Sequence, residues 1–125
     1  MSIDIDRNKD LMQKIVEIFN TGDLSDVDRV FSPQYIDHQK PEGWDVTGPE
    51  EFRQIVTNAH NSLKTLIVTI EDLFAESDKV AARLQWHSVD LTGAEVNRET
   101  IDILRIENGK VIEHWGAEEW RSVVD

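Results

Sequence analysis

Asp102 is the residue of this chain whose surroundings most strongly suggest chemistry. It stands between Ile101 and Ile103 in a segment with the alternating pattern of a β-strand. A carboxylate is costly to bury without a partner, so its place in an apolar strand needs a reason. If it faces a cavity, desolvation would raise its pKa and allow proton transfer near neutral pH. The alternative is a carboxylate on the outer, wet face, or one paired structurally with Arg83 or Arg98.

His114 is the candidate partner of Asp102. Asn108-Gly109 is typical of a two-residue type I′ hairpin turn, because both positions accept a positive φ. Counting outward from that turn places Asp102 opposite Trp115 and diagonally next to His114. An Asp that orients a neutral imidazole and stabilises its protonated form is a general-base arrangement. The alternative is a partly exposed His on the sheet surface.

Three further side chains are candidates for contact with a ligand. Trp86 shares a strand face with small and apolar residues, so it could form the wall of a pocket for a flat aromatic compound. Trp44 lies in a turn-rich loop that could close above it as a lid. His38 stands at the edge of this loop, where it either contacts the ligand or caps a turn. Trp115 and Trp120 are expected in packing or in a dimer interface, where aromatic residues are enriched.

The charge of the chain argues against several classes of partner. It has 25 acidic and 13 basic residues, a formal net charge of -12, and no cluster of Lys and Arg suited to a phosphate backbone. Nucleic acid and anionic membrane surfaces are therefore not expected, and no apolar run reaches the length of a transmembrane helix. The acidic, polar first residues lack the order of a signal peptide, so we expect a cytoplasmic location.

The sequence also limits the available chemistry. There are no cysteines, which removes thiolate nucleophiles, disulfides and Cys-based zinc sites. No His-x-His or His-Glu-x-x-His spacing indicates a metal site, and no Gly-x-Ser-x-Gly elbow, phosphate-binding loop or dinucleotide motif is present. We therefore expect acid/base chemistry with no metal and no cofactor.

The elements that must position these residues follow from the hydrophobic periodicity. Apolar residues recur at helical spacing in three segments, of which the second ends before Ser32-Pro33 and the third begins at Pro49. After Lys64 the period changes to that of strands. The predicted helices span residues 8–20, 24–31 and 49–63, and the predicted strands span residues 34–38, 65–75, 80–91, 95–106 and 110–118.

Helices segregated from a long antiparallel meander predict an α+β fold, in which the helices cover one face of the sheet. A strongly curved sheet that is closed over by helices leaves an internal pocket. With 125 residues and no linker or internal repeat, the chain is expected to form a single domain over residues 1–125.

One hairpin carries the most specific resemblance. Residues 101–115, IDILRIENGKVIEHW, resemble the signature of the SnoaL-like, polyketide-cyclase-like branch of the nuclear-transport-factor-2-like superfamily. Further similar segments are Phe-Asn-Thr-Gly-Asp at 19–23, Tyr-Ile-Asp-His at 35–38, Gly-Pro-Glu at 48–50 and Asp-Lys-Val-Ala-Ala-Arg at 78–83. The resemblance covers nearly the whole chain. It implies a cone-shaped fold, with three N-terminal helices packed on a strongly curved, mostly antiparallel sheet around a pocket.

The functions that this resemblance implies are diverse, since the fold serves cyclases, isomerases, dehydratases, epoxide hydrolases and binding proteins. In the aldol cyclases that the chain resembles, an acid/base Asp commonly follows the His-Trp pair, whereas this chain has Gly116. A Thr-His-x-Gly-like segment that is frequent in the family is replaced by Asp-Leu-Thr-Gly at 90–93. In ketosteroid-isomerase-like relatives, an Asp in a context similar to that of Asp102 lines the pocket.

The leading hypothesis is an enzyme that uses Asp102, assisted by His114, to isomerise, cyclise or hydrate a small hydrophobic or aromatic carbonyl compound. The alternative is a non-catalytic binding or accessory protein, in which the same cavity holds an apolar metabolite that Asp102 merely orients. Gly116 favours this alternative. A third possibility is a protein-interaction module that uses the outer face of the sheet. A homodimer formed through the sheet is compatible with all three.

Overall fold

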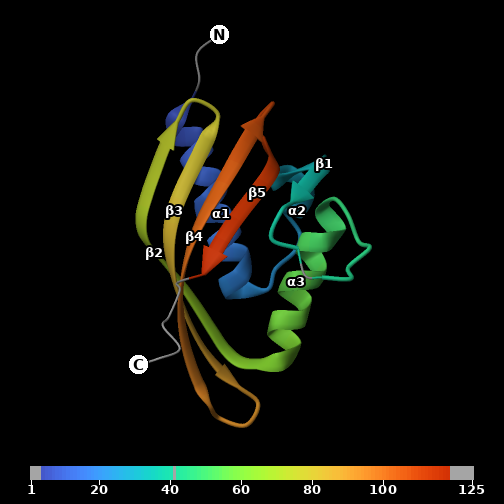
Figure 1. The fold of residues 1–125 in the computed structure, drawn as a ribbon, viewed down its shortest axis with the longest axis vertical. Helices are drawn as coiled ribbons and strands as arrows, with labels where there is room; N and C mark the ends of the chain where they lie inside the picture. Colours follow the sequence, from blue (N-terminus) through green and yellow to red (C-terminus); the bar gives the residue numbers. More distant parts are fainter. Residues whose placement is uncertain (1–3, 41, 119–125) are drawn as a thin grey trace.

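The computed structural model describes residues 4–40 and 42–118, which form three helices and five strands (Figure 1). Trp120, which we expected in packing or an interface, lies outside the described residues. In chain order the elements are α1 (Ile5–Thr21), α2 (Val27–Val30), β1 (Phe31–Asp37), α3 (Pro49–Ser62), β2 (Leu63–Glu76), β3 (Lys79–Asp90), β4 (Glu95–Glu107) and β5 (Lys110–Glu118).

The strands form one open sheet in the order β1-β5-β4-β3-β2. Neighbouring strands are antiparallel, except that β1 and β5 run parallel. Figure 1 shows a curved sheet with α1 packed behind it and α3 beside it. The predicted α+β fold, with helices covering one face of a strongly curved and mostly antiparallel sheet, is confirmed.

The core fills the space between the inner face of the sheet and the helices. Val80, Ala82 and Leu84 of β3 are buried on this inner face, whereas Ala81 and Arg83 between them point to the outer face, as a period of two predicts. The buried core residues of the helices and of β1 are Met12, Ile15, Val16, Ile18, Val27, Val30, Phe31, Tyr35, Phe52 and Val56.

Helix α1 extends beyond the predicted range at both ends. The Asp4 carboxylate caps its first turn by accepting a hydrogen bond of 2.9 Å from the backbone N–H of Arg7. Gly22 ends the helix with a φ of 75°, in the left-handed region that favours glycine. The Asn20 amide bonds both backbone groups of Val68 in β2, at 2.6 and 2.9 Å, which fixes the helix against the sheet.

The second helix and the first strand differ from the prediction. The helix is limited to four residues, and Ser32-Pro33 lies inside β1 instead of separating the two elements. Proline is tolerated here because β1 is an edge strand whose pairing with β5 is irregular between Phe31 and Ile36. The strand therefore begins at Phe31, before the predicted start at residue 34.

The hairpin between β4 and β5 has the predicted turn. Asn108 and Gly109 have φ values of 53° and 75°, which fits a type I′ turn. The pairing then shifts by one residue between Arg105 and Ile106, which is a β-bulge that the counting from the turn did not include.

This bulge corrects the predicted register. Asp102 lies opposite Gly116, not opposite Trp115, and His114 lies opposite Leu104. Directly paired residues share a face of the sheet, so the shift moves Trp115 to the outer face and leaves Asp102 and His114 together on the inner face. The predicted diagonal neighbourhood of the two residues is therefore present, although the register that suggested it was off by one.

Candidate active site

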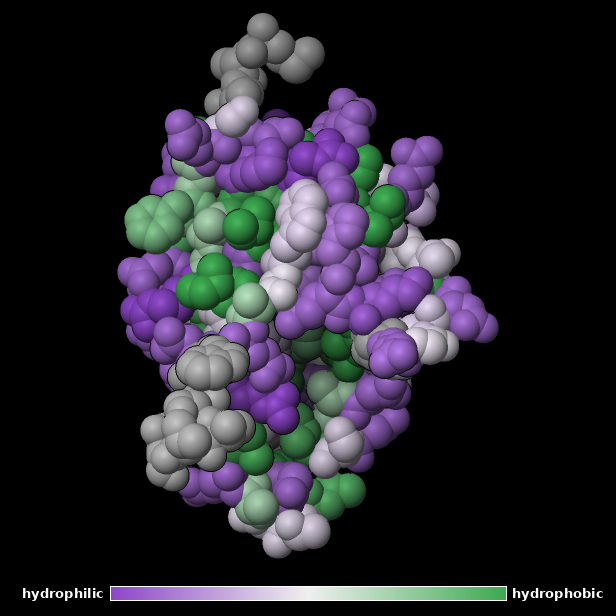
Figure 2. Space-filling model, in the orientation of Figure 1, coloured by the Kyte–Doolittle hydropathy of each residue, from purple (hydrophilic) through white to green (hydrophobic). Residues whose placement is uncertain are grey.

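A pocket of about 520 Å³ opens between the inner face of the sheet, α1 and α3. Figure 2 shows the surface hollowed below its centre. The wall of the pocket is mostly apolar. Its apolar lining residues include Met12, Ile15, Phe19, Phe31, Phe52, Ile55, Leu66, Leu84, Trp86 and Leu104.

Three adjacent strands place three titratable side chains at one end of this pocket. The strand order β1-β5-β4 brings Asp37, His114 and Asp102 side by side, because Asp37 pairs with His114 across the parallel β1-β5 ladder. Asp37 and Asp102 are buried and His114 is partly buried, with side-chain exposures of 7% for Asp37, 15% for His114 and 9% for Asp102. We call these residues the Asp–His–Asp chain.

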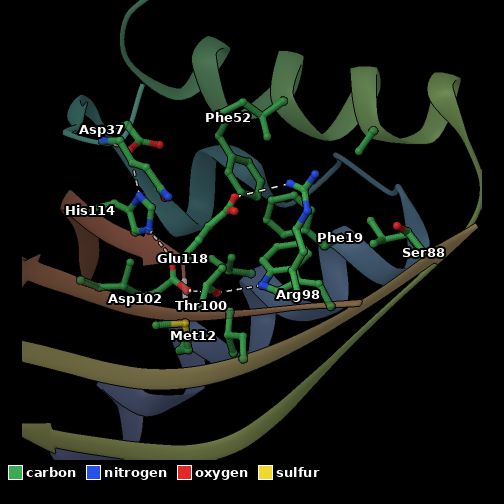
Figure 3. A pocket seen from close by; sticks show the side chains of 18 of the residues that line it. Met12, Phe19, Asp37, Phe52, Ser88, Arg98, Thr100, Asp102, His114 and Glu118 are labelled. Carbon is green, nitrogen blue, oxygen red and sulfur yellow. Dashed lines mark hydrogen bonds and ion pairs between the residues drawn. The ribbon is translucent and has the colours of Figure 1, made fainter. Parts of the chain in front are cut away.

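Both ring nitrogens of His114 are engaged within this chain (Figure 3). Nδ1 lies 2.8 Å from Oδ1 of Asp37, and Nε2 lies 2.7 Å from Oδ1 of Asp102. An imidazole donates from both nitrogens only when it is protonated. The contacts therefore fit an imidazolium between two carboxylates, and not the neutral imidazole that we expected.

A second layer of hydrogen bonds holds the two carboxylates. The Tyr35 hydroxyl donates to Oδ2 of Asp37 at 3.1 Å, and the backbone N–H of Gln39 donates to Oδ1 at 2.9 Å. On the other side, the Thr100 hydroxyl donates to Oδ2 of Asp102 at 2.6 Å. Trp86 in turn donates from Nε1 to the Thr100 oxygen at 2.8 Å. Each carboxylate is thus oriented from two directions.

The charges of the chain stabilise one another. Burial alone would lower the pKa of His114, but the hydrogen bonds and charges of Asp102 and Asp37 outweigh it and raise the pKa to about 9. Burial would likewise raise the pKa of Asp37, but its hydrogen bond with His114 and the charge of that residue bring the pKa below the usual range. His114 therefore stabilises the fold fully below its ordinary pKa of 6.5, and this contribution is lost as the pH rises through about 9.

Of the three residues predicted to contact a ligand, one lines the pocket and two do not. Trp86 lines the pocket, whereas His38 and Trp44 are not among its lining residues. His38 points away from the pocket: its Nε2 lies 2.7 Å from the Glu113 carboxylate, and its ring stacks on Trp115 with 4.9 Å between the ring centroids. A role of His38 or Trp44 in ligand binding would require the loop after β1 to move.

Sequence reasoning missed Tyr35 and Asp37, although a signal was present. In the Tyr-Ile-Asp-His segment the side chains alternate, so Tyr35 and Asp37 share the inner face while His38 points outward. The alternation alone does not say which face is inner. The parallel pairing of β1 with β5 decides it, and this pairing joins residues that are far apart in the sequence.

At Gly116, where the cyclases that the chain resembles commonly have an acid, a side chain would displace the Gln39 amide. A Cβ atom at this position would overlap the end of the Gln39 side chain and lie 3.0 Å from Oδ1 of Asp102. The amide of Gln39 therefore occupies the space beside Asp102, so Asp37, on β1, is the second carboxylate at this end of the pocket.

Within the described part of the chain, no group of three or more His, Asp or Glu side chains is arranged to hold a metal ion.

One further carboxyl lies close to the site. Glu51, in the first turn of α3, is 2% exposed, and its Oε1 has no hydrogen-bond partner among the described residues. Its Oε2 lies 3.9 Å from Nζ of Lys40. Burial raises the pKa of Glu51, and the nearby Asp37 charge adds to this.

Known proteins share this architecture. The chain matches the model of the SnoaL-like polyketide cyclase family over residues 9–120. TsrD from Streptomyces laurentii has 25% sequence identity and a TM-score of 0.84, covering 94% of this chain and 92% of TsrD. A candidate polyketide cyclase from Bacillus cereus has 26% identity and a TM-score of 0.82, covering 90% and 74% of the two chains. A SnoaL-like polyketide cyclase from Agrobacterium tumefaciens shares the fold at 14% identity, with a TM-score of 0.76 and coverages of 90% and 91%. No curated protein matches the chain.

The raised pKa of Glu51 predicts a pH-dependent effect of Glu51→Gln on stability. A carboxyl whose pKa is higher in the folded state costs stability once the pH exceeds its ordinary value of 4.5. The variant should therefore be more stable than the wild type at pH 8, on the order of 1 kcal/mol, and the difference should disappear near pH 4. Urea unfolding at both pH values measures this.

Glu50→Gln is the matched control, because Glu50 lies in the same turn but is exposed to solvent. It should show little change and no such trend with pH. If Glu51→Gln is less stable than the wild type at pH 8, Glu51 is ionised in the folded protein and the contact with Lys40 stabilises it.

Proposed function

The chain belongs to the SnoaL-like polyketide cyclase family, and on this basis we propose that it is an acid/base enzyme that works without a cofactor. Its substrate would be a small hydrophobic or aromatic carbonyl compound, and its reaction a cyclisation or a related isomerisation or hydration. The observation that carries this proposal is the buried Asp–His–Asp chain at one end of an apolar pocket. Ionised groups held in such surroundings are suited to proton transfer.

In this proposal Asp102 is the base. Its carboxylate takes a proton from the carbon next to the substrate carbonyl, which leaves an enolate. For a cyclisation, the enolate carbon then forms the new bond to a second carbonyl carbon, whose oxygen becomes an alkoxide. The apolar wall lowers the dielectric constant around the site, which strengthens its electrostatic interactions.

His114 supplies the acid. Once Asp102 is protonated, it attracts the imidazolium less, so the Nε2–H of His114 becomes available to the alkoxide and donates its proton. The proton on Asp102 then returns to His114, and the site is restored with no net gain or loss of protons. Asp37 positions His114 and keeps it charged between turnovers.

The alternative function is non-catalytic binding, in which Asp102 only orients an apolar metabolite. One observation favours it: the place of the acid in the cyclases that this chain resembles is taken by Gly116 and covered by the Gln39 amide. The two functions differ in whether the ionised Asp102 removes a proton from a bound carbonyl compound.

The exchange of α-protons of β-tetralone in D2O separates the two functions. This two-ring ketone fits the proposed substrate class, and proton NMR follows the loss of its α-proton signals. The wild type should accelerate exchange at neutral pH, and Asp102→Asn should lower the catalysed rate by about 100-fold or more, since it removes the base. Asp37→Asn should lower it less, because it acts through His114.

Asp72→Asn is the matched control, since Asp72 pairs with Arg83 outside the pocket. It should leave exchange unchanged. A folded Asp102→Asn protein that exchanges the protons as fast as the wild type would contradict the role of Asp102, and an inactive wild type that binds β-tetralone would support the binding alternative.

We also propose that the chain forms a homodimer through the outer face of the sheet. Phe74, Ala81, Ile103 and Trp115 lie opposite one another in a row across β2, β3, β4 and β5. Phe74 is 66% exposed and Ile103 is 36% exposed. Apolar side chains are visible over these strands in Figure 2. A second copy would remove this row from water.

Ile103→Glu tests the dimer. It places a charge in the middle of the row, so sedimentation velocity should detect a monomer where the wild type is a dimer. Leu91→Glu is the control, because Leu91 is equally apolar and exposed but lies in the turn between β3 and β4. A wild type that sediments as a monomer at high concentration would contradict this proposal.

We further propose that residues 1–125 form a single domain and that the protein is cytoplasmic. No helix among the described residues has the length and apolar character needed to cross a membrane.

A further inference from the structure

The pocket has a second polar region, farther along the strands from the Asp–His–Asp chain. Arg98 of β4 and Glu118 of β5 both line the pocket, and Nη1 of Arg98 lies 3.4 Å from Oε1 of Glu118 (Figure 3). Arg98 is on the inner face because it pairs directly with Trp86, and Glu118 pairs with Thr100. The two charged side chains therefore face the same space as Asp102.

The distance between the two polar regions sets the spacing of the polar groups that a ligand could present to them. Arg98 precedes Asp102 on the same strand, and a strand rises about 3.3 Å per residue, so their backbone positions are about 13 Å apart. The Arg98 side chain reaches inward and shortens this span. Apolar side chains also line the pocket, among them Phe19, Phe52 and Trp86, whose Nε1 bonds Thr100 between Arg98 and Asp102 on β4. The space suits roughly two fused rings with a polar group at each end.

Arg98 is the pocket cation that has donors to offer. His114, the other cation that lines the pocket, already donates from both ring nitrogens. A guanidinium has five N–H donors, and within residues 4–40 and 42–118 the one ion pair of Arg98 is its contact with Glu118 at 3.4 Å. The side chains of both residues are more than half exposed, which keeps this pair weak.

We propose that Arg98 binds an anionic group on the ligand, such as a carboxylate or an ionised phenol, in the polar region away from Asp102. Glu118 competes with that group for the guanidinium. The ligand class is then a flat ring compound with an acidic group at one end and a carbonyl at the other. The acidic end is inferred from Arg98 alone, whereas the carbonyl end rests on the proposed function of Asp102.

Two fluorescent dyes with the same rings test the acidic end. Anilinonaphthalenesulfonate carries an anionic group, and phenylnaphthylamine is the same ring system without it. The wild type should bind the anionic dye more tightly. Arg98→Gln should weaken its binding about tenfold, which is the effect of one lost hydrogen bond to a charged group, and should leave the neutral dye unaffected. Glu118→Gln should strengthen the binding of the anionic dye only.

Arg83→Gln is the matched control, since Arg83 is on the neighbouring strand but points to the outer face, where it pairs with Asp72 and Glu99. It should change the binding of neither dye, and the thermal unfolding of each variant shows that it is folded. An unchanged preference for the anionic dye in Arg98→Gln would overturn the proposal. The assay measures binding and not catalysis, so Asp102→Asn should still prefer the anionic dye to the neutral one. This result therefore stays valid even if the proposed catalysis by Asp102 is wrong.

Discussion

The burial of three charges in the Asp–His–Asp chain is the constraint on which the rest of the structure depends. A buried imidazolium or carboxylate costs several kcal/mol unless oppositely charged and hydrogen-bonding groups surround it. Here each group meets that need for its neighbour, and Tyr35 and Thr100 occupy the outer carboxylate oxygens. His114 reaches both carboxylates because β5 lies between β1 and β4. The strand order and the parallel pairing of β1 with β5 therefore bring the three charges together.

The same arrangement separates the pocket into regions with different chemistry. Charged groups that bond one another lie at one end, aromatic side chains line the wall beside them, and the exposed Arg98–Glu118 pair lies farther along the strands. The apolar wall strengthens the electrostatic effects near Asp102, because apolar side chains screen charges less than water does. Because the exposed Arg98–Glu118 ion pair is weak, Arg98 can leave Glu118 and bind an anionic group of a ligand at a small cost in free energy. The Asp–His–Asp chain thus suits proton transfer, and the region of Arg98 and Glu118 suits recognition of a ligand.

The sequence predicted those parts of the site that depend on local patterns. The alternation around Asp102 and the Asn-Gly turn placed it near His114, although a β-bulge shifts the register by one residue. Asp37 was not found, because its role depends on a parallel pairing between distant segments. For the same reason His38, its neighbour, was assigned to the site although its side chain points outward. That the Gln39 amide covers Gly116 could not be predicted, since it depends on a loop conformation.

The protonation state of His114 tests the central claim most directly. Nitrogen-15 NMR of the folded protein, with His114→Gln to assign the signals, reports the protonation of both ring nitrogens as the pH changes. An imidazolium between two carboxylates predicts that both nitrogens are protonated at neutral pH and that the ring titrates with a pKa of about 9. A ring that is protonated on one nitrogen at neutral pH, with a pKa at or below the ordinary value of 6.5, would contradict it.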